Sequence, residues 1–306
     1  MDQNYQPYQT EQFYQAPPVK KNASYFRAKA RAALKGKLPL ASVANFVWTI
    51  LQTTAMMVGI LPLYIVMIVS LIANEGNVAD PFAIFPMVLA CYGVMLLAML
   101  FVSAPLTVGY YRIHLDIIDG KPIQFTKLFS GFKNSFGKSI KVSILYGLSI
   151  VLSLLPFFLL TIVGAVLGAL TDIEIMQSVI MVLTAIPGYF ISVVLLLVFV
   201  YRYSMSFFIL AEYPEMRAID VLRNSASLMR GRKWRLFCLQ FSFIGWFFLV
   251  FLCGIVTCGI GIMIGVYVLS AYQITATTAF YDDITNRAAA RETEFPSLNP
   301  DDYVVE

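Results

Sequence analysis

The chain has 306 residues, of which 59% are hydrophobic and only 13% are charged, and its formal net charge is +4. Its mean hydropathy is +0.74. Charged residues make up about a quarter of an ordinary soluble domain, so this composition excludes that class and indicates an integral membrane protein.

The N-terminal segment, residues 1–23, is rich in Gln and Tyr and ends near Pro17 and Pro18. It holds too few aliphatic residues to build a core, which predicts a disordered cytoplasmic tail. Residues 286–306 are similarly polar and broken by proline, which predicts a second tail. Between the tails we expect one six-helix membrane domain, residues 24–285.

Five uncharged runs follow, each longer than the roughly 20 residues needed to cross about 30 Å of hydrocarbon. They are Leu38–Asn74, Pro81–Tyr111, Val142–Thr171, Ile175–Tyr201 and Leu236–Tyr281. The last run would reach about 69 Å as one helix, and Gly254, Gly259 and Gly261 permit a turn near its middle. The sequence therefore predicts an all-α membrane protein with six transmembrane helices.

A basic amphipathic segment, here called an elbow, precedes each pair of these helices. The three elbows are residues 24–36, 124–138 and 215–231. In the first, Arg27, Arg31 and Lys35 recur every four residues and share one helical face. We predict three helical hairpins, each preceded by an elbow helix at the membrane surface, which either feeds the next helix or senses lipid.

Short similar sequences end the elbows and the hairpins. The elbows close on LKGK at 34–37, SFGK at 135–138 and MRGR at 229–232. The outgoing helices carry Tyr111-Arg112, Tyr201-Arg202 and Tyr272-Gln273. We interpret the chain as three parallel repeats related by an axis along the membrane normal.

Six crossings place both tails and both long polar connections on one side, and all 22 Lys and Arg residues lie on that side. The positive-inside rule makes this side cytoplasmic. The first apolar run is much longer than the roughly 7–15 apolar residues of a signal peptide, so we expect no cleaved leader and cytoplasmic termini.

A basic cluster stands directly before the fifth predicted helix: Arg230, Arg232, Lys233, Trp234 and Arg235. Such residues anchor a helix start and face anionic lipid head groups. A nucleic-acid site is not expected, because no separate basic domain is present to carry one.

The fourth apolar run ends at Tyr201, Arg202 and Tyr203, after which an apolar stretch resumes up to Glu212. We expect this trio to anchor the helix at the inner membrane boundary, with the following segment emerging or lying along the interface. The alternative is that Arg202 faces inward and binds an anionic ligand or pairs with Asp116.

No Asp, Glu, Lys or Arg occurs within the uncharged runs, which argues against an ion-coupled transporter. The polar residues that remain there include Gln52, Gln240, Gln273 and Thr277. They either join neighbouring helices by hydrogen bonds or line a passive pore.

Catalytic, metal and cofactor sites are not expected. His114 is the single histidine, so a histidine-based metal cluster or a histidine-activated nucleophile is missing. Gly131–Ser139 resembles a phosphate-binding loop but has five residues between its glycines instead of four. Asp282 and Asp283, like Asp116 and Asp119, are interpreted as solvated helix ends.

The four cysteines give no metal pattern. Cys91 and Cys238 are expected as apolar fillers within helices. Cys253 and Cys258 flank the predicted outer turn, where they either remain thiols or form a disulfide in an oxidising exterior.

Three segments, ALKGK at 33–37, SASLMRGRKWRLFCLQFSFIGW at 225–246 and YQITATTAFYDDI at 272–284, together resemble the bacterial domain-of-unknown-function 975 family of integral membrane proteins. The likeness covers roughly residues 24–285. That family has a proline before the tyrosine of the last helix, where this chain has Ala271. The resemblance implies a bacterial plasma-membrane setting and no established activity.

From these features we expect a non-enzymatic scaffold or membrane-associated interaction or homeostasis factor. Its partners would be the lipid bilayer, anionic lipid head groups and a protein that the sequence does not identify. The alternative is a passive pore or small-solute facilitator lined by the polar residues named above.

The predicted topology is testable by thiol labelling in a variant without the four native cysteines. A cysteine introduced by Thr171→Cys should react with an impermeant reagent added outside the cell, because it lies in an outer turn, and reporters fused at either terminus should read as cytoplasmic. The control, Lys133→Cys, should react only from the cytoplasm; its labelling from outside would contradict the topology.

Overall fold

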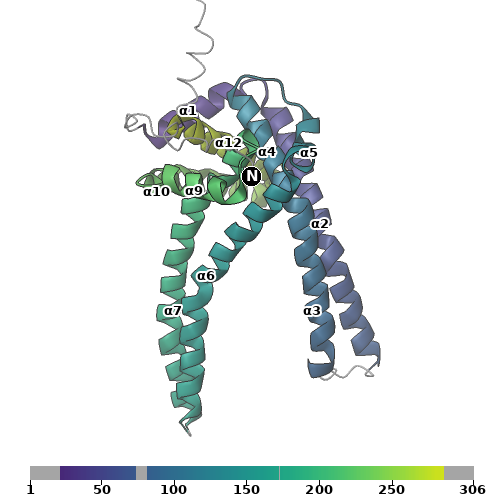
Figure 1. Ribbon diagram of the computed structural model, residues 1–306, viewed down its shortest axis with the longest axis vertical. Helices are drawn as coiled ribbons and strands as arrows, with labels where there is room; N and C mark the ends of the chain where they lie inside the picture. Colours follow the sequence, from purple (N-terminus) through teal and green to yellow (C-terminus); the bar gives the residue numbers. More distant parts are fainter. Residues whose placement is uncertain (1–20, 74–80, 172, 286–306) are drawn as a thin grey trace, which may run out of the picture. The chain divides into compact units, whose positions relative to one another are not determined.

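The computed structural model describes residues 21–73, 81–171 and 173–285. Every regular element in this part of the chain is a helix (Figure 1). The predicted tails lie outside the described residues, apart from 21–23. In chain order the helices are α1 (Ala23–Leu34), α2 (Leu38–Ala73), α3 (Pro81–Ala98), η2 (Met99–Ser103), α4 (Ala104–Ile118), η3 (Phe125–Phe129), α5 (Ser130–Asn134), α6 (Phe136–Ala169), α7 (Glu174–Tyr203), α8 (Ser206–Glu212), α9 (Ala218–Leu228), α10 (Lys233–Phe241), α11 (Ile244–Val256) and α12 (Ile260–Ile284).

Six helical stretches within the described residues are long and apolar enough to cross a membrane, which confirms the predicted class and number of crossings. A stretch of 34 residues, such as Phe136–Ala169, is about 51 Å long and therefore extends beyond the hydrocarbon core. The six are Leu38–Ser70, Phe85–Ile118, Phe136–Ala169, Glu174–Glu212, Lys233–Val256 and Ile260–Ile284.

The chain divides into two compact units, which are described separately. Unit 1 comprises the described residues of Met1–Val43, His114–Ile123 and Trp234–Glu306. Unit 2 comprises those of Ala44–Ile113 and Gln124–Lys233. Because the segments of the two units alternate along the sequence, each unit is built from parts that are far apart in the chain.

Unit 1 contains the hairpin of α11 and α12, onto which α1 packs. The predicted turn in the last uncharged run is confirmed: α11 ends at Val256 and Gly259 adopts a left-handed φ of 96° before α12. On α1, the small or apolar residues Phe26, Ala30 and Leu34 are buried. Their spacing of four places them on one face.

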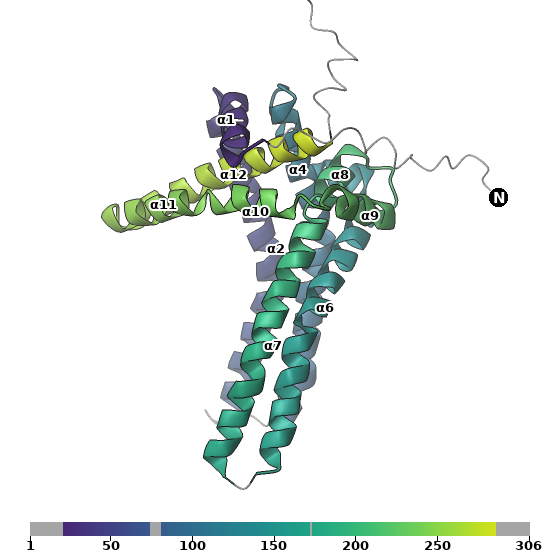
Figure 2. The same cartoon turned by 90° about the vertical axis from the view of Figure 1, so that its left-hand side faces the viewer.

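Unit 2 contains the long antiparallel hairpin of α6 and α7, which lie side by side in both views (Figures 1 and 2). Glycines allow the two backbones to approach: an added Cβ at Gly164 would overlap Thr184, and one at Gly188 would press on Phe157. Pro156 lies inside α6, and the N–H of Phe157 beside it donates to Ser192 Oγ of α7 at 3.0 Å.

In the same unit, α2 and α4 are joined by an aromatic pair and hydrogen bonds. The rings of Trp48 and Tyr110 stack with centroids 4.6 Å apart, and the Tyr110 hydroxyl donates to Asn45 Oδ1 at 3.3 Å. The π-helical turn η2 lies just before Pro105. The proline ring would clash with the carbonyl four residues earlier in a regular helix, which explains the widened turn at this point.

Helix α7 stops at Tyr203 and α8 begins at Ser206, so the helix breaks directly after the predicted anchor residues. The location of these residues at the inner membrane boundary stays a prediction. Ser225 of α9 secures the break: its hydroxyl donates to the Arg202 carbonyl and accepts from the Met205 N–H, both at 3.2 Å. The segment after the break, α8, is buried within unit 2 beside α9, so it is not a helix lying on the surface of the protein.

The second and third elbows pack against the hairpin that precedes them in the chain, and the first elbow packs against the last hairpin. In unit 1, α1 contacts α12; in unit 2, α9 contacts α6, α7 and α8. The second elbow forms two short helices, η3 and α5, instead of one, and its backbone meets α4 at two glycine contacts, Gly109 with Leu128 and Gly131 with Pro105. A location at the membrane surface stays a prediction for all three elbows.

The repeat is supported by the glycines that end the first and third elbows. Gly36 and Gly231 both follow a helix and have φ values of 75° and 74°, the left-handed conformation that commonly ends a helix. The corresponding Gly137 lies instead within α6. The second repeat therefore departs from the other two at its elbow.

The contact of Gly109 with Leu128 predicts a strong effect of an added methyl group. A Cβ at Gly109 would overlap the Leu128 carbonyl oxygen, a backbone atom that moves only with its whole turn. Gly109→Ala should lower the free energy of unfolding in detergent by about 1–3 kcal/mol. The control is Gly147→Ala, because nothing lies within 4 Å of a Cβ there; it should be neutral or stabilising, and equal loss in both variants would contradict the contact.

Candidate functional site

The last turn of α12 carries two buried carboxylates, which the sequence had suggested were solvated. The side chain of Asp282 has an exposed fraction of 0% and that of Asp283 has 4%. The helix dipole is negative at this end, so buried anions here require cations. The solvated interpretation of these two aspartates is wrong.

The cations come from α1, from the residues before it and from α10. Lys29 Nζ lies 2.5 Å from Asp282 Oδ2, and Lys21 Nζ lies 2.7 Å from Asp283 Oδ1. Arg235 Nη2 lies 3.4 Å from Asp283 Oδ2 and at the same distance from the Lys21 carbonyl oxygen. These five residues form an ion-pair cluster that joins the beginning of the described chain to its end.

The hydrogen bond to Asp283 raises the pKa of the Lys21 ammonium above its ordinary value of 10.5. A group whose pKa is raised by folding stabilises the fold fully below the unfolded value and loses that effect as the pH rises through the folded value. The Lys21 ammonium therefore stays charged at neutral pH, and its contribution to stability is lost in strong alkali.

Aromatic rings surround the cluster. The Phe26 and Phe280 centroids are 5.4 Å apart in an edge-to-face arrangement, and the Arg235 guanidinium lies 5.9 Å and 5.6 Å from them. Only 21% of the Arg235 side chain is exposed. Stacking on two rings while bound to a carboxylate suits the planar guanidinium.

A further buried polar contact in unit 1 lies on α12. His114 Nδ1 of α4 is 2.9 Å from Thr275 Oγ1, and both side chains are buried. The Thr275 hydroxyl lies 2.7 Å from the Ala271 carbonyl oxygen, to which it donates. The histidine is therefore held by a helix-packing contact.

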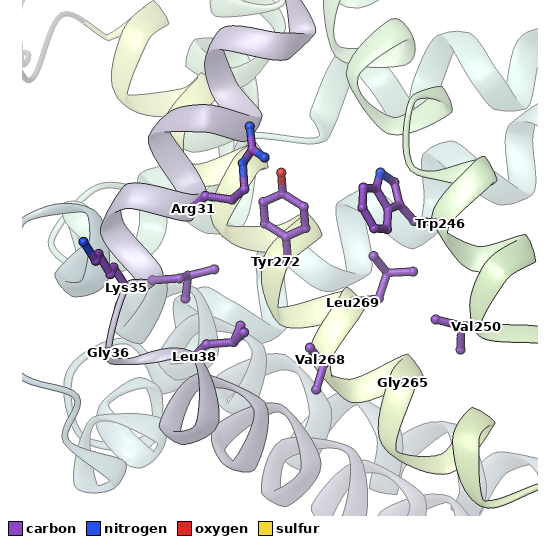
Figure 3. Close-up of a pocket in the computed structure, with 11 residues that line it drawn as sticks. Arg31, Lys35, Gly36, Leu38, Trp246, Val250, Gly265, Val268, Leu269 and Tyr272 are labelled. Carbon is purple, nitrogen blue, oxygen red and sulfur yellow. The ribbon is translucent and has the colours of Figure 1, made fainter. Parts of the chain in front are cut away.

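A pocket of about 540 Å³ opens where α1 meets the hairpin of α11 and α12. Figure 3 shows Arg31 next to Tyr272 at one end and Gly265 and Val250 toward the other. We call it the α1 pocket. Its lining residues are Arg31, Leu34, Lys35, Gly36, Leu38, Trp246, Val250, Gly265, Val268, Leu269 and Tyr272.

The α1 pocket combines an apolar wall with two cations. Aliphatic and aromatic side chains from α11 and α12 face it, while Arg31 and Lys35 come from the last turn of α1 and its C-cap. The Tyr272 hydroxyl donates to the Arg27 carbonyl oxygen at 3.2 Å, which fixes α1 over the hairpin. The pocket can accept a molecule with an apolar body and an anionic end.

The family described as "Protein of unknown function (DUF975)" matches residues 21–288 of this chain. The chain belongs to the DUF975 family. No curated protein and no solved structure matches it. The match confirms the resemblance found in the sequence and covers all of the described residues from α1 to α12.

The predicted interfacial anchors of this DUF975 chain fall into different environments. Arg202 and Arg230 are exposed, and Trp234 is 71% exposed and stacks on Phe237. Arg232 donates to the Leu228 carbonyl oxygen at 3.1 Å, near the C-terminal end of α9. Tyr201, Tyr203 and Lys233 are half-buried, and Arg235 belongs to the ion-pair cluster. Contact of any of them with lipid stays a prediction.

Among the predicted intramembrane polar residues, Gln52 contacts a neighbouring helix and Thr277 bonds within its own helix. The Gln52 amide lies 3.4 Å from the Ser103 carbonyl oxygen and from Thr107 Oγ1. Thr277 donates to the carbonyl oxygen of Gln273 at 3.0 Å, within α12. Gln240 is half-buried in α10.

All four cysteines are free thiols in the structure. Cys253, near the end of α11, and Cys258, in the turn between α11 and α12, are both exposed, and Cys258 has a left-handed φ of 52°. Cys238 is exposed too, so its expected role as an apolar filler is not supported within the protein itself.

The α1 pocket was missed in the sequence, although one signal for it was present. The spacing of Arg31 and Lys35 placed them on one helical face, but it did not indicate which hairpin that face would meet. Trp246 and Tyr272 were read as parts of a family motif, and nothing local connects them to α1. The ion-pair cluster was missed for the same reason.

Breaking the pair between Lys29 and Asp282 should destabilise unit 1, because Asp282 would remain buried without its cation. We expect Lys29→Met to lower the free energy of unfolding by about 3 kcal/mol. The double variant Lys29→Met/Asp282→Asn should recover most of this loss, since no charge is left unpaired. Denaturant unfolding in detergent measures both.

The matched control is Lys121→Met, since the Lys121 side chain is 53% exposed and pairs with Asp119 at 3.4 Å. An exposed pair contributes about 0–1 kcal/mol. Similar losses in Lys29→Met and Lys121→Met would show that the cluster does not hold α1 on α12.

Proposed function

We propose that this multi-pass membrane protein is a non-enzymatic protein of the bacterial plasma membrane that acts through lipids and a protein partner. In this proposal both termini are cytoplasmic and the α1 pocket binds an anionic phospholipid. The wall of α11 and α12 takes part of an acyl chain, and the cations of α1 take the phosphate.

The observation that carries the proposal is the composition of the α1 pocket. Two cations, Arg31 and Lys35, stand at one edge of a wall made of Leu38, Trp246 and Val268 with other apolar residues. A phospholipid is complementary to this arrangement, because its anionic phosphate can face the two cations and its hydrocarbon can face the apolar wall. Each Lys or Arg near an anionic membrane surface adds about 1 kcal/mol of attraction, and an apolar chain favours the wall.

Two further features support a role without catalysis in the cytoplasmic leaflet. All Lys and Arg residues lie on the predicted cytoplasmic side, which supports that orientation for the α1 pocket. His114, the single histidine, is buried against Thr275. A buried packing histidine supports a structural role for it.

The alternative, a passive pore or small-solute facilitator, has less support. Gln52 directs its amide to neighbouring backbone and hydroxyl oxygens of unit 2, and Thr277 directs its hydroxyl to its own helix. Side chains whose donors are used in this way favour helix packing over a solute path.

The proposal is tested by measuring binding of phosphatidylglycerol and phosphatidylcholine to the detergent-solubilised protein by native mass spectrometry. Arg31→Gln/Lys35→Gln should weaken phosphatidylglycerol binding about tenfold or more and leave phosphatidylcholine binding unchanged. The control Lys133→Gln/Lys141→Gln removes the same charge from two exposed lysines that do not line the α1 pocket.

An equal loss of phosphatidylglycerol binding in both double variants would show that the lysines and arginines attract the anionic lipid without a specific site, and it would overturn the proposed site in the α1 pocket. Solute flux through proteoliposomes that Gln52→Leu abolishes would favour the facilitator instead. Thermal unfolding of each variant separates loss of binding from loss of fold.

A further inference from the structure

A second pocket, of about 470 Å³, lies in unit 2 where α9 meets the hairpin of α6 and α7. It shares no residue with the α1 pocket, and we call it the α9 pocket. Three arginines line it: Arg202, Arg223 and Arg230. The remaining lining residues are Leu145, Leu148, Ser149, Leu152, Phe199, Tyr203, Ile219, Leu222, Ala226 and Ser227.

The fold fixes the direction from which each arginine reaches the pocket. Arg223 lies on α9, Arg230 follows the end of that helix, and both line the pocket. Arg202 lies at the end of α7, directly before the break that Ser225 secures. The hydroxyl of Ser225 therefore ties the end of α7, which carries Arg202, to α9, which carries Arg223.

These guanidinium groups are only partly neutralised. Asp220 Oδ1 lies 3.7 Å from Arg223 Nη1, but its Oδ2 lies 3.4 Å from Nε of Arg217, a residue outside the pocket. One carboxylate is thus shared by two arginines. Arg202 lies 5.7 Å from the ring centroid of Tyr203 and is exposed, as are Arg223 and Arg230. The rim of the pocket keeps an excess of positive charge.

An apolar strip leads away from the arginines along α6. Leu145, Leu148 and Leu152 lie three or four residues apart on one face of that helix, and Phe199 of α7 stands beside them. The strip is about 10 Å long at 1.5 Å per residue. It matches the first part of an acyl chain.

We infer that the α9 pocket binds a phospholipid whose head group is a phosphomonoester, such as phosphatidic acid. A phosphomonoester carries close to two negative charges at pH 7 and presents three strong acceptor oxygens, because its second pKa is about 6. Three guanidinium groups, each with a planar pair of N–H donors, match this group better than a phosphodiester with one charge. The α1 pocket, with one Arg and one Lys, matches the diester.

The second elbow provides a comparison within the same protein, because it lacks a cation at the position where the first and third elbows have one. When the repeats are aligned on Gly36, Gly137 and Gly231, the residue before the glycine is Lys35, Phe136 and Arg230. In the second repeat, Phe136 stands in a row of rings with Phe132 and Phe101, with centroids 5.9 Å and 6.0 Å apart. The second elbow therefore presents rings where the other two present cations.

The inference extends the proposed lipid binding to another site, and the test keeps the two apart. Binding of phosphatidic acid and phosphatidylglycerol to the full chain is measured by native mass spectrometry between pH 5 and 8. Arg223→Gln/Arg230→Gln should weaken phosphatidic acid binding about tenfold or more and leave phosphatidylglycerol binding unchanged. Arg223→Lys/Arg230→Lys keeps the charge and loses the planar guanidinium. Its affinity for phosphatidic acid should lie between that of the unchanged protein and that of the Gln double variant.

The matched control is Arg217→Gln, which removes an arginine that contacts the same Asp220 but lies outside the pocket. It should bind phosphatidic acid like the unchanged protein. In the unchanged protein, binding should strengthen as the pH rises through about 6, where the phosphomonoester gains its second charge. The Gln double variant should lose that pH dependence.

Three results would overturn the inference: equal affinity of the unchanged protein for both lipids, equal loss in Arg217→Gln, or displacement of phosphatidic acid by soluble glycerol 3-phosphate, which would assign the arginines to free phosphates. Loss of phosphatidylglycerol binding in Arg31→Gln/Lys35→Gln with phosphatidic acid binding retained would support both sites. If Arg31→Gln/Lys35→Gln instead lost phosphatidic acid binding and kept phosphatidylglycerol binding, only the proposed lipid site in the α1 pocket would be overturned.

Discussion

The arrangement of unit 1 depends on charge compensation at the last turn of α12. Asp282 and Asp283 are buried at the end of a helix where the dipole already disfavours anions, so the turn is stable only with cations beside it. Lys21, Lys29 and Arg235 supply them. Because two of these lie on or just before α1, the need for cations decides where α1 packs, and this packing closes one side of the α1 pocket.

The three elbows each pack on a hairpin, but through different kinds of contact. Each covers the preceding hairpin in the cyclic order of the repeats, the first through ion pairs, the second through backbone contacts at Gly109 and Gly131, and the third through the hydroxyl of Ser225. An elbow helix has polar and apolar sides, and a hairpin contact buries its apolar side. The cations at the ends of the first and third elbows stay available for a ligand.

The sequence predicted well those features that depend on local composition. Long uncharged runs identified the six candidate crossings, and the glycines near the middle of the last run, Gly259 among them, indicated the turn between α11 and α12. It could not predict the partners of Asp282 or the surroundings of Tyr272, since these depend on contacts between residues more than 240 positions apart. The burial of α8 and the division of the second elbow were missed because an amphipathic pattern does not reveal what covers its apolar side.

The pairing of α1 with α12 also determines when unit 1 can be completed during synthesis. Lys29 and Asp282 are separated by 253 positions, and a ribosome adds about 5–20 residues each second. The first helix therefore waits for at least about ten seconds before its partner has been made. During that interval its buried face, with Phe26 and Leu34, has no α12 to cover it. A chain that stops before α12 keeps that face uncovered, which gives the quality-control machinery of the cell a physical sign of incomplete synthesis.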